Sequence, residues 1–179
     1  MSMAMDRSLP NRMIRAARLD SQLYEEVEND TSATSQAAIV VTIAALAAGI
    51  AALFRDGIAT AIVGVIGALI GWVLWAAITY FVGKTFFATA ETQVDLGEML
   101  RALGFSYSPG IFAIVGSIPV LGGIVALVIA IWQLIASVIA VRQALDFSTG
   151  RAIGTVIVGW IVQIAITFVI LLVISPFIT

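Results

Sequence analysis

The side chains best suited to specific polar interactions are amides and indoles that lie inside long apolar segments. Gln133 follows Trp132 directly, and Gln163 comes three residues after Trp160. Because a buried amide or indole N–H needs a hydrogen-bond partner, we expect these four side chains to form a polar layer between packed helices. The alternative is that the same groups line a pocket for a ligand or pigment.

Catalysis has few candidate residues in this chain. Histidine and cysteine are absent, which removes the usual general base, the thiolate nucleophile and the commonest metal ligands. A Ser–Lys dyad would require a serine beside Lys84, and the three candidates fit helix caps and turns better: Ser106, Ser108 and Ser148. We therefore expect no catalytic residue and a protein that is not an enzyme.

Three carboxylates, Glu91, Asp95 and Glu98, recur on one face of a helix that we expect over residues 88–103. Oxygen ligands of this kind suit a hard cation. Carboxylates along a surface helix are nevertheless usually its solvated face. We therefore expect no metal site and no cofactor.

The elements that carry these side chains are defined by the distribution of charge. Hydrophobic residues make up 61% of the 179 residues and charged residues 11%. Residues 102–141 contain no charge, and residues 57–83 and 152–179 are equally bare. A water-soluble surface needs charge, whereas hydrocarbon excludes it. The sequence predicts an integral membrane protein, and a net charge of -2 gives no sign of nucleic-acid binding.

Five membrane spans are expected, because about 20 apolar residues cross the hydrocarbon core as a helix. The third is short, and glycine and proline separate it from the fourth. The fold class predicted is thus an all-α integral membrane protein with five transmembrane helices, over residues 36–54, 58–82, 109–117, 120–141 and 151–174.

The first 36 residues form a polar arm ahead of a membrane domain over residues 37–179. Apolar side chains recur at helical spacing between residues 10 and 29, although Asp20 interrupts them. We expect one amphipathic helix there, which lies on the membrane surface or on the cytoplasmic face of the domain.

Glycine spacing in the second span predicts helix packing. Gly67 and Gly71 form a GxxxG pair, and Gly64 precedes them; glycines at this spacing let another helix approach closely. The same span carries Trp72 and Trp75, which would join the polar layer.

A second candidate binding region surrounds the last turn. Arg142 and Arg151 flank it, and Ser148 and Thr149 lie at a helix N-terminus. Arginine and free N–H groups suit a phosphate, so these residues are candidates for anchoring lipid headgroups. Ordinary electrostatic anchoring at the cytoplasmic face is the alternative.

The basic residues also predict the orientation. With five spans, eight lysines and arginines fall on the side of the N-terminus and Arg55 alone falls on the other. Because basic residues stay in the cytoplasm, we expect a cytoplasmic N-terminus and an external C-terminus.

Short motifs resemble those of a known family. Gly104, Phe105 and Pro109 belong to a Gly-Phe-Ser-Tyr-Ser-Pro run that enters the third span, and Pro119 lies in the following hairpin. Together with the Val-Arg-Gln-Ala-Leu-Asp-Phe-Ser run of residues 141–148, they are similar to the Yip1 domain in its prokaryotic form. The resemblance implies five membrane helices, a cytoplasmic N-terminus and a prokaryotic plasma membrane.

Eukaryotic members of that family act in vesicle traffic and bind Rab-type GTPases. This chain has Phe105 where they often have tyrosine, and it lacks an Asp-Leu-Tyr-Gly-Pro motif before the first span. The resemblance therefore does not imply GTPase binding here.

The function expected from these observations is that of a non-enzymatic membrane scaffold or adaptor. Its partners would be membrane lipids and other integral membrane proteins, either as an accessory subunit of a respiratory or photosynthetic complex or as a trafficking-type adaptor. The alternative is a passive channel or a lipid transporter of the scramblase type, suggested by the short third span, since broken helices line cavities in transporters.

Overall fold

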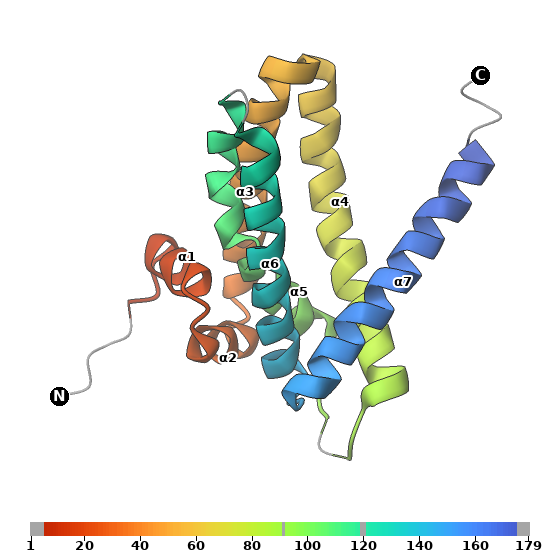
Figure 1. Cartoon of the computed structure of the whole chain (residues 1–179). Coiled ribbons are helices and arrows are strands. Elements are labelled where there is room, and N and C mark those ends of the chain that lie inside the picture. Colours follow the sequence, from red (N-terminus) through yellow and green to blue (C-terminus); the bar gives the residue numbers. More distant parts are fainter. Residues whose placement is uncertain (1–5, 91, 119–120, 175–179) are drawn as a thin grey trace.

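The structure, a computed structural model, describes residues 6–90, 92–118 and 121–174. All regular structure in this part of the chain is helical (Figure 1). Pro119 and Glu91 lie outside it. In order, the elements are α1 (Leu9–Ala17), α2 (Ser21–Asn29), α3 (Ala33–Asp56), α4 (Ile58–Val82), the π-helix η1 (Gly83–Phe87), α5 (Leu96–Ser106), the 3₁₀-helix η2 (Ser108–Ser117), α6 (Gly122–Ala144) and α7 (Thr149–Ile174).

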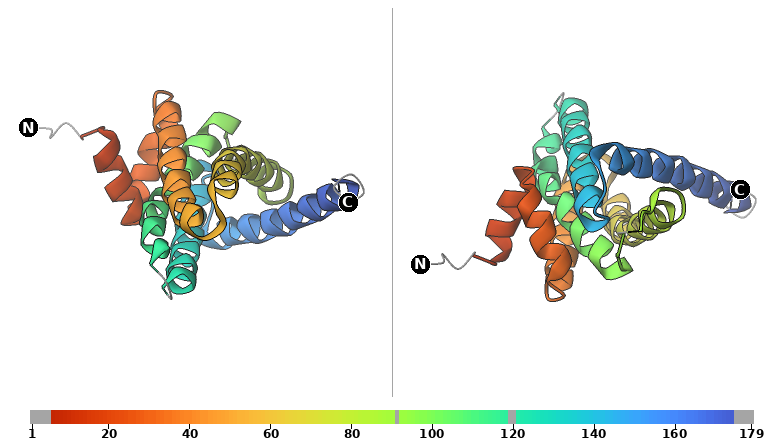
Figure 2. Two further views of the ribbon diagram at one scale, coloured as in Figure 1. Left: turned by 90° about the horizontal axis from the view of Figure 1, so that it is seen from above. Right: turned by 90° about the horizontal axis from the view of Figure 1, so that it is seen from below.

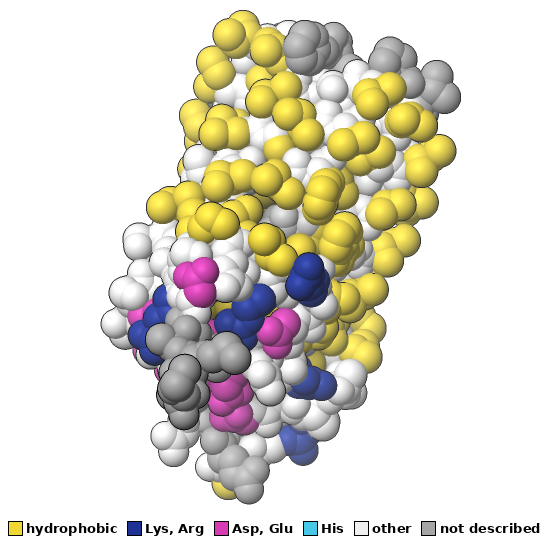
Figure 3. Space-filling model, turned by 90° about the vertical axis from the view of Figure 1, so that its left-hand side faces the viewer, with side chains coloured by type: hydrophobic (Ala, Val, Ile, Leu, Met, Phe, Trp, Pro, Cys, Tyr) yellow, Lys and Arg dark blue, Asp and Glu magenta, His cyan; other side chains and the backbone are white. Residues whose placement is uncertain are grey.

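Five helical stretches in the described residues are long and apolar enough to span a membrane. This confirms the prediction of an all-helical membrane protein with five spanning segments. The charged side chains gather at one end of the molecule, and hydrophobic side chains cover the rest of the face shown in Figure 3. The five stretches are Ala33–Leu53, Ile58–Phe87, Leu96–Ser117, Gly122–Ala144 and Thr149–Ile170.

The arm contains two helices, so the prediction of one helix over residues 10–29 was wrong. The chain breaks at Leu19, whose φ of 62° is left-handed. Asp20 then caps α2, because its side chain accepts a hydrogen bond of 3.0 Å from the backbone N–H of Gln22. Asp20, which interrupts the apolar pattern, is therefore the N-cap of a second helix.

The prediction of a surface helix over residues 88–103 was also wrong. Helix α5 begins only at Leu96, after a capping box in which the Asp95 side chain accepts from the backbone N–H of Glu98 at 2.7 Å and Glu98 accepts from that of Asp95 at 2.9 Å. These two carboxylates therefore close a helix terminus. From Met99 onward most of α5 is buried, and it packs against α2, α3, α4 and α6.

The third spanning segment is longer than expected. The predicted stretch over residues 109–117 coincides with η2, but α5 leads directly into it, and the two form one candidate span, Leu96–Ser117. Its 22 residues make it one of the five candidate spans by length and composition.

Small residues bring α3 into close contact with this third segment. A Cβ atom placed on Gly104 would lie 2.6 Å from the Cβ of Ala37, and one on Gly110 would lie 2.7 Å from the Cβ of Ala44. Both distances are far below van der Waals contact. Glycine is therefore required at these two positions for the helices to approach, as in other small-residue interfaces between membrane helices.

Gly104→Ala should destabilise the protein by about 1–3 kcal/mol, because the added methyl group has no space against Ala37. Gly64→Ala is the matched control, since nothing lies within 4 Å of its Cβ position, and it should leave stability unchanged. Thermal unfolding in detergent measures both. Equal melting temperatures for the two variants would contradict the close contact.

Candidate functional site

Ion pairs hold the two arm helices together. Arg12 is fully buried, and its Nη2 atom donates to Glu26 at 2.8 Å and to Asp30 at 2.7 Å. Arg15 adds ion pairs to Glu26 at 2.7 Å and to Asp20 at 2.8 Å. These paired charges fold α1 back onto α2. Hydrogen bonds from the Ser32 hydroxyl and from Arg12 lower the pKa of Asp30 to about 2.

A buried arginine joins the arm to the core. Arg101 of α5 is 5% exposed, and its Nε atom donates to the carbonyl oxygens of Val27 and Glu28, each at 3.0 Å. Its Nη2 atom also donates to the carbonyl of Glu28. These carbonyls belong to the last turn of α2, where a helix leaves acceptors unpaired and favours a cation.

The apolar side of the arm packs on the spanning helices. Leu23, Tyr24 and Val27 are fully buried, and α2 contacts α5 and α6. Trp132 of α6 donates from its indole nitrogen to the Ala17 carbonyl at the end of α1, at 2.8 Å. Of the two placements expected for the arm, the structure has the one on the domain's own face.

One carboxyl group is buried where the arm meets the core without a full set of hydrogen bonds. Glu28 is 8% exposed, and its Oε2 atom has no hydrogen-bond partner among the described residues. Burial raises the pKa of Glu28 to about 8, with further contributions from Glu25, Asp146 and Glu98, while Arg101 opposes the shift.

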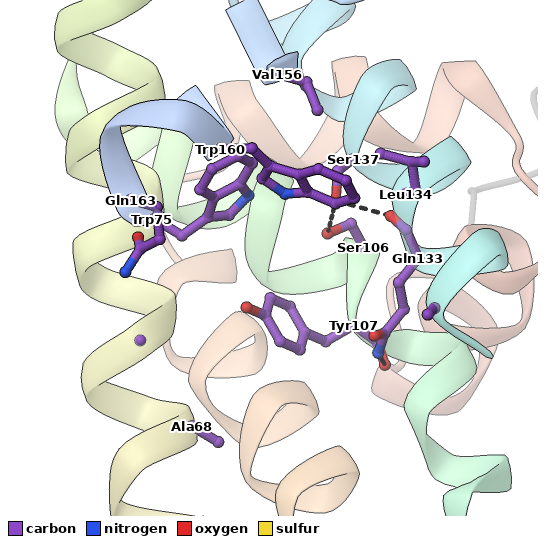
Figure 4. Close-up of a pocket in the computed structure, with 12 residues that line it drawn as sticks. Ala68, Trp75, Ser106, Tyr107, Gln133, Leu134, Ser137, Val156, Trp160 and Gln163 are labelled. Atoms are coloured by element: carbon purple, nitrogen blue, oxygen red, sulfur yellow. Dashed lines mark hydrogen bonds between the residues drawn. The ribbon is translucent and has the colours of Figure 1, made fainter. Parts of the chain in front are cut away.

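Three of the four expected polar residues meet in a cavity of about 370 Å³. Gln133 of α6 and the α7 residues Trp160 and Gln163 line it (Figure 4). Trp132 is not among the lining residues and instead stacks on Phe112, with ring centroids 5.7 Å apart. Trp72 also lies outside the cavity and donates to the Leu100 carbonyl at 3.1 Å. The other lining residues are Ala68, Gly71, Trp75, Ser106, Tyr107, Ala130, Leu134, Ser137 and Val156.

Two serines in this cavity were not expected from the sequence. The hydroxyl oxygens of Ser106 and Ser137 lie 3.3 Å apart, as Figure 4 shows. Ser137 is four residues after Gln133 and therefore on the same face of α6, which is a signal that the sequence contained. The side chain of Gln163 completes the polar lining, and its Oε1 atom is buried without a hydrogen-bond partner among the described residues.

The glycines of α4 are not in close contact with another helix of this chain. Nothing in the described part of the chain lies within 4 Å of a Cβ placed on Gly64, Gly67 or Gly71. Glycines on α7 behave differently, since a Cβ on Gly154 would meet Phe87 at 2.8 Å and one on Gly159 would meet Trp75 at 3.3 Å. Gly71 lines the cavity, whereas Gly64 and Gly67 leave an open stretch of helix surface.

The candidate headgroup residues lie at the turn between α6 and α7. Arg142 lies in the last turn of α6, and its Nε atom donates to the side-chain oxygen of Gln143 at 3.0 Å. Ser148, Thr149 and Arg151 are exposed around the start of α7. The family-like residues lie deeper, because Gly104, Phe105 and Pro109 are buried where α5 passes into η2.

The architecture defines a helical membrane protein whose N-terminal helices are folded onto one end of its spanning helices. The model of the Yip1 domain matches residues 21–172, and the chain belongs to the Yip1 domain family. The match begins at the first residue of α2 and so includes part of the arm. No curated protein matches the chain, and no solved structure matches it.

Arg101→Met should cost about 2–4 kcal/mol of stability, because the carbonyl of Glu28 would remain buried without a donor and that of Val27 would keep only the backbone N–H of Asp30. Arg151→Met, at an exposed position on α7, serves as the control and should change little. Denaturant unfolding followed by tryptophan fluorescence measures both. If the two variants unfold alike, the arm does not depend on this arginine.

The buried carboxyl of Glu28 predicts a pH dependence. Its raised pKa means that the folded state binds a proton more tightly than the unfolded state, whose Glu pKa is about 4.3. Its contribution to stability is therefore complete below about pH 4 and is lost as the pH rises to about 8. The melting temperature should fall over this range, and Glu28→Gln should reduce the slope and stabilise the protein at pH 8. Asp6→Asn, at an exposed position and outside the groups that raise the pKa of Glu28, should preserve the slope.

Proposed function

We propose that the protein is a non-enzymatic membrane scaffold or adaptor that binds other integral membrane proteins through its spanning helices. The observation that supports this most directly is the contrast among its glycines. Gly104 and Gly110 bring helices of this chain together, whereas Gly64 and Gly67 have no neighbour within 4 Å of their Cβ positions. Glycines that allow close helix contact but have no internal partner suit a helix from another protein.

Helix α7 adds a second free surface. It leans away from the other spanning helices toward the C-terminus, as Figures 1 and 2 show. Its side chains there are exposed hydrophobics, including Ile161, Ile164 and Phe168. In a bilayer such a surface is compatible with lipid and with a partner helix, so α4 and α7 together provide two adjacent contact surfaces.

The proposed orientation places the arm in the cytoplasm and the C-terminus outside, in a prokaryotic plasma membrane. The grouping of basic residues supports it, since arginine and lysine avoid translocation. The arm and the turn before α7 would then contact lipid headgroups and cytoplasmic partners. The role that follows is either an accessory subunit of a larger membrane complex or a trafficking-type adaptor that does not use GTPase binding.

The α4 glycines provide the test. In the double variant Gly64→Leu, Gly67→Leu, the recovery of partner chains that co-purify in mild detergent should fall about tenfold, equivalent to about 1.4 kcal/mol. Gly123→Leu is the control, because its Cβ position is also open but lies on α6. A wild-type protein that migrates alone as a monomer would contradict the scaffold role. So would a double variant that retains its partners.

A further inference from the structure

We propose that the cavity bounded by α4, α5, α6 and α7 is a binding site for an uncharged lipid alcohol, held by its free hydroxyl group. This inference goes beyond the scaffold role, because it concerns a small molecule and side chains that face into the protein. It rests on the depth of the cavity, its unpaired acceptor, its lack of charge and its open side.

The cavity lies well inside the spanning segments. Gln163 is 11 residues before the end of α7, and Gln133 is 11 residues before the end of α6. At about 1.5 Å per residue both positions are about 17 Å from the nearest end of their helix. Water is scarce at that depth, so polar atoms there require partners from protein or ligand.

The cavity contains a buried acceptor that lacks a donor. Gln163 Oε1 is buried with no donor among the described residues. The Ser106 hydroxyl donates its hydrogen to the Leu103 carbonyl, and the Ser137 hydroxyl donates to the Gln133 carbonyl, each at 2.7 Å, so neither serine supplies that hydrogen bond. A ligand that donates an O–H would supply it.

The charge of the lining selects against ionised headgroups. None of the described residues that line the cavity is aspartate, glutamate, lysine or arginine. A phosphate or an amine would lose its hydration there without gaining an ion pair, which is costly at this depth. A hydroxyl group avoids this cost.

The shape suits a headgroup whose tail remains in the bilayer. A volume of about 370 Å³ is near the lower end of ligand sites. Among its lining residues, Trp75 of α4 is 8% exposed, whereas Trp160 of α7 is 50% exposed. The cavity is therefore more open at Trp160, where an apolar tail can leave.

The experiment measures the melting temperature of delipidated protein in detergent with added dioctanoylglycerol, and with the same lipid capped as a methyl ether. We expect the free alcohol to raise the melting temperature and the ether to have little effect. Gln163→Leu should raise the melting temperature of the ligand-free protein, because it removes an unpaired buried amide. It should also weaken binding at least fivefold.

Two further variants keep this test decisive. Thr167→Val removes a polar group one turn along α7, at an exposed position, and should bind like the wild type. Ala68→Leu fills the cavity without removing a polar group and should abolish the response. A short polyprenol and a quinol, used in place of the glyceride, identify which natural alcohol fits best.

Equal responses to the alcohol and to its ether would overturn the inference, and so would an unchanged response in Gln163→Leu or Ala68→Leu. The inference would also be overturned if none of the three alcohols raised the melting temperature. None of these results depends on Gly64 or Gly67, so the cavity and the scaffold role can fail independently.

Discussion

The position of the arm depends on one buried cation. Arg101 donates into the last carbonyls of α2 from the middle of the most enclosed helix of the described chain. A guanidinium that is 5% exposed is tolerable only when its donors are paired, and a helix C-terminus offers acceptors with a favourable dipole. Because α5 also contacts α3, α4 and α6, this contact connects the arm to most of the bundle.

The bundle consequently has two unlike sides. On one side, α3 packs closely on α5 and η2 through Gly104 and Gly110, and the arm covers the end of these elements. On the other side, α4 and α7 meet near one end only and diverge beyond it (Figure 1). Both the proposed contact surface for partner helices and the polar cavity lie on this open side, while the family-like residues at the α5–η2 junction belong to the compact side.

The spanning segments could be predicted from the sequence because hydrocarbon excludes charge, and each segment shows this in its own residues. The placement of α5 did not, because its apolar and charged residues resemble a surface helix until the carbonyls of α2, more than 70 residues away in sequence, satisfy Arg101. The break at Leu19 was signalled by Asp20. The divergence of Trp132 from Gln133 was also foreseeable, since adjacent helical residues point about 100° apart.

The 3₁₀ conformation of η2 makes chain length, rather than composition, the critical property of this segment. As an α-helix its ten residues would be about 5 Å shorter, and the residues at its end near Ser117 would shift by that length along α3. An inserted or deleted residue would shift every later contact with α3 and α6. Relatives that share this geometry should therefore preserve Gly110 and the number of residues between Ser108 and Ser117, while the other side chains of the segment vary.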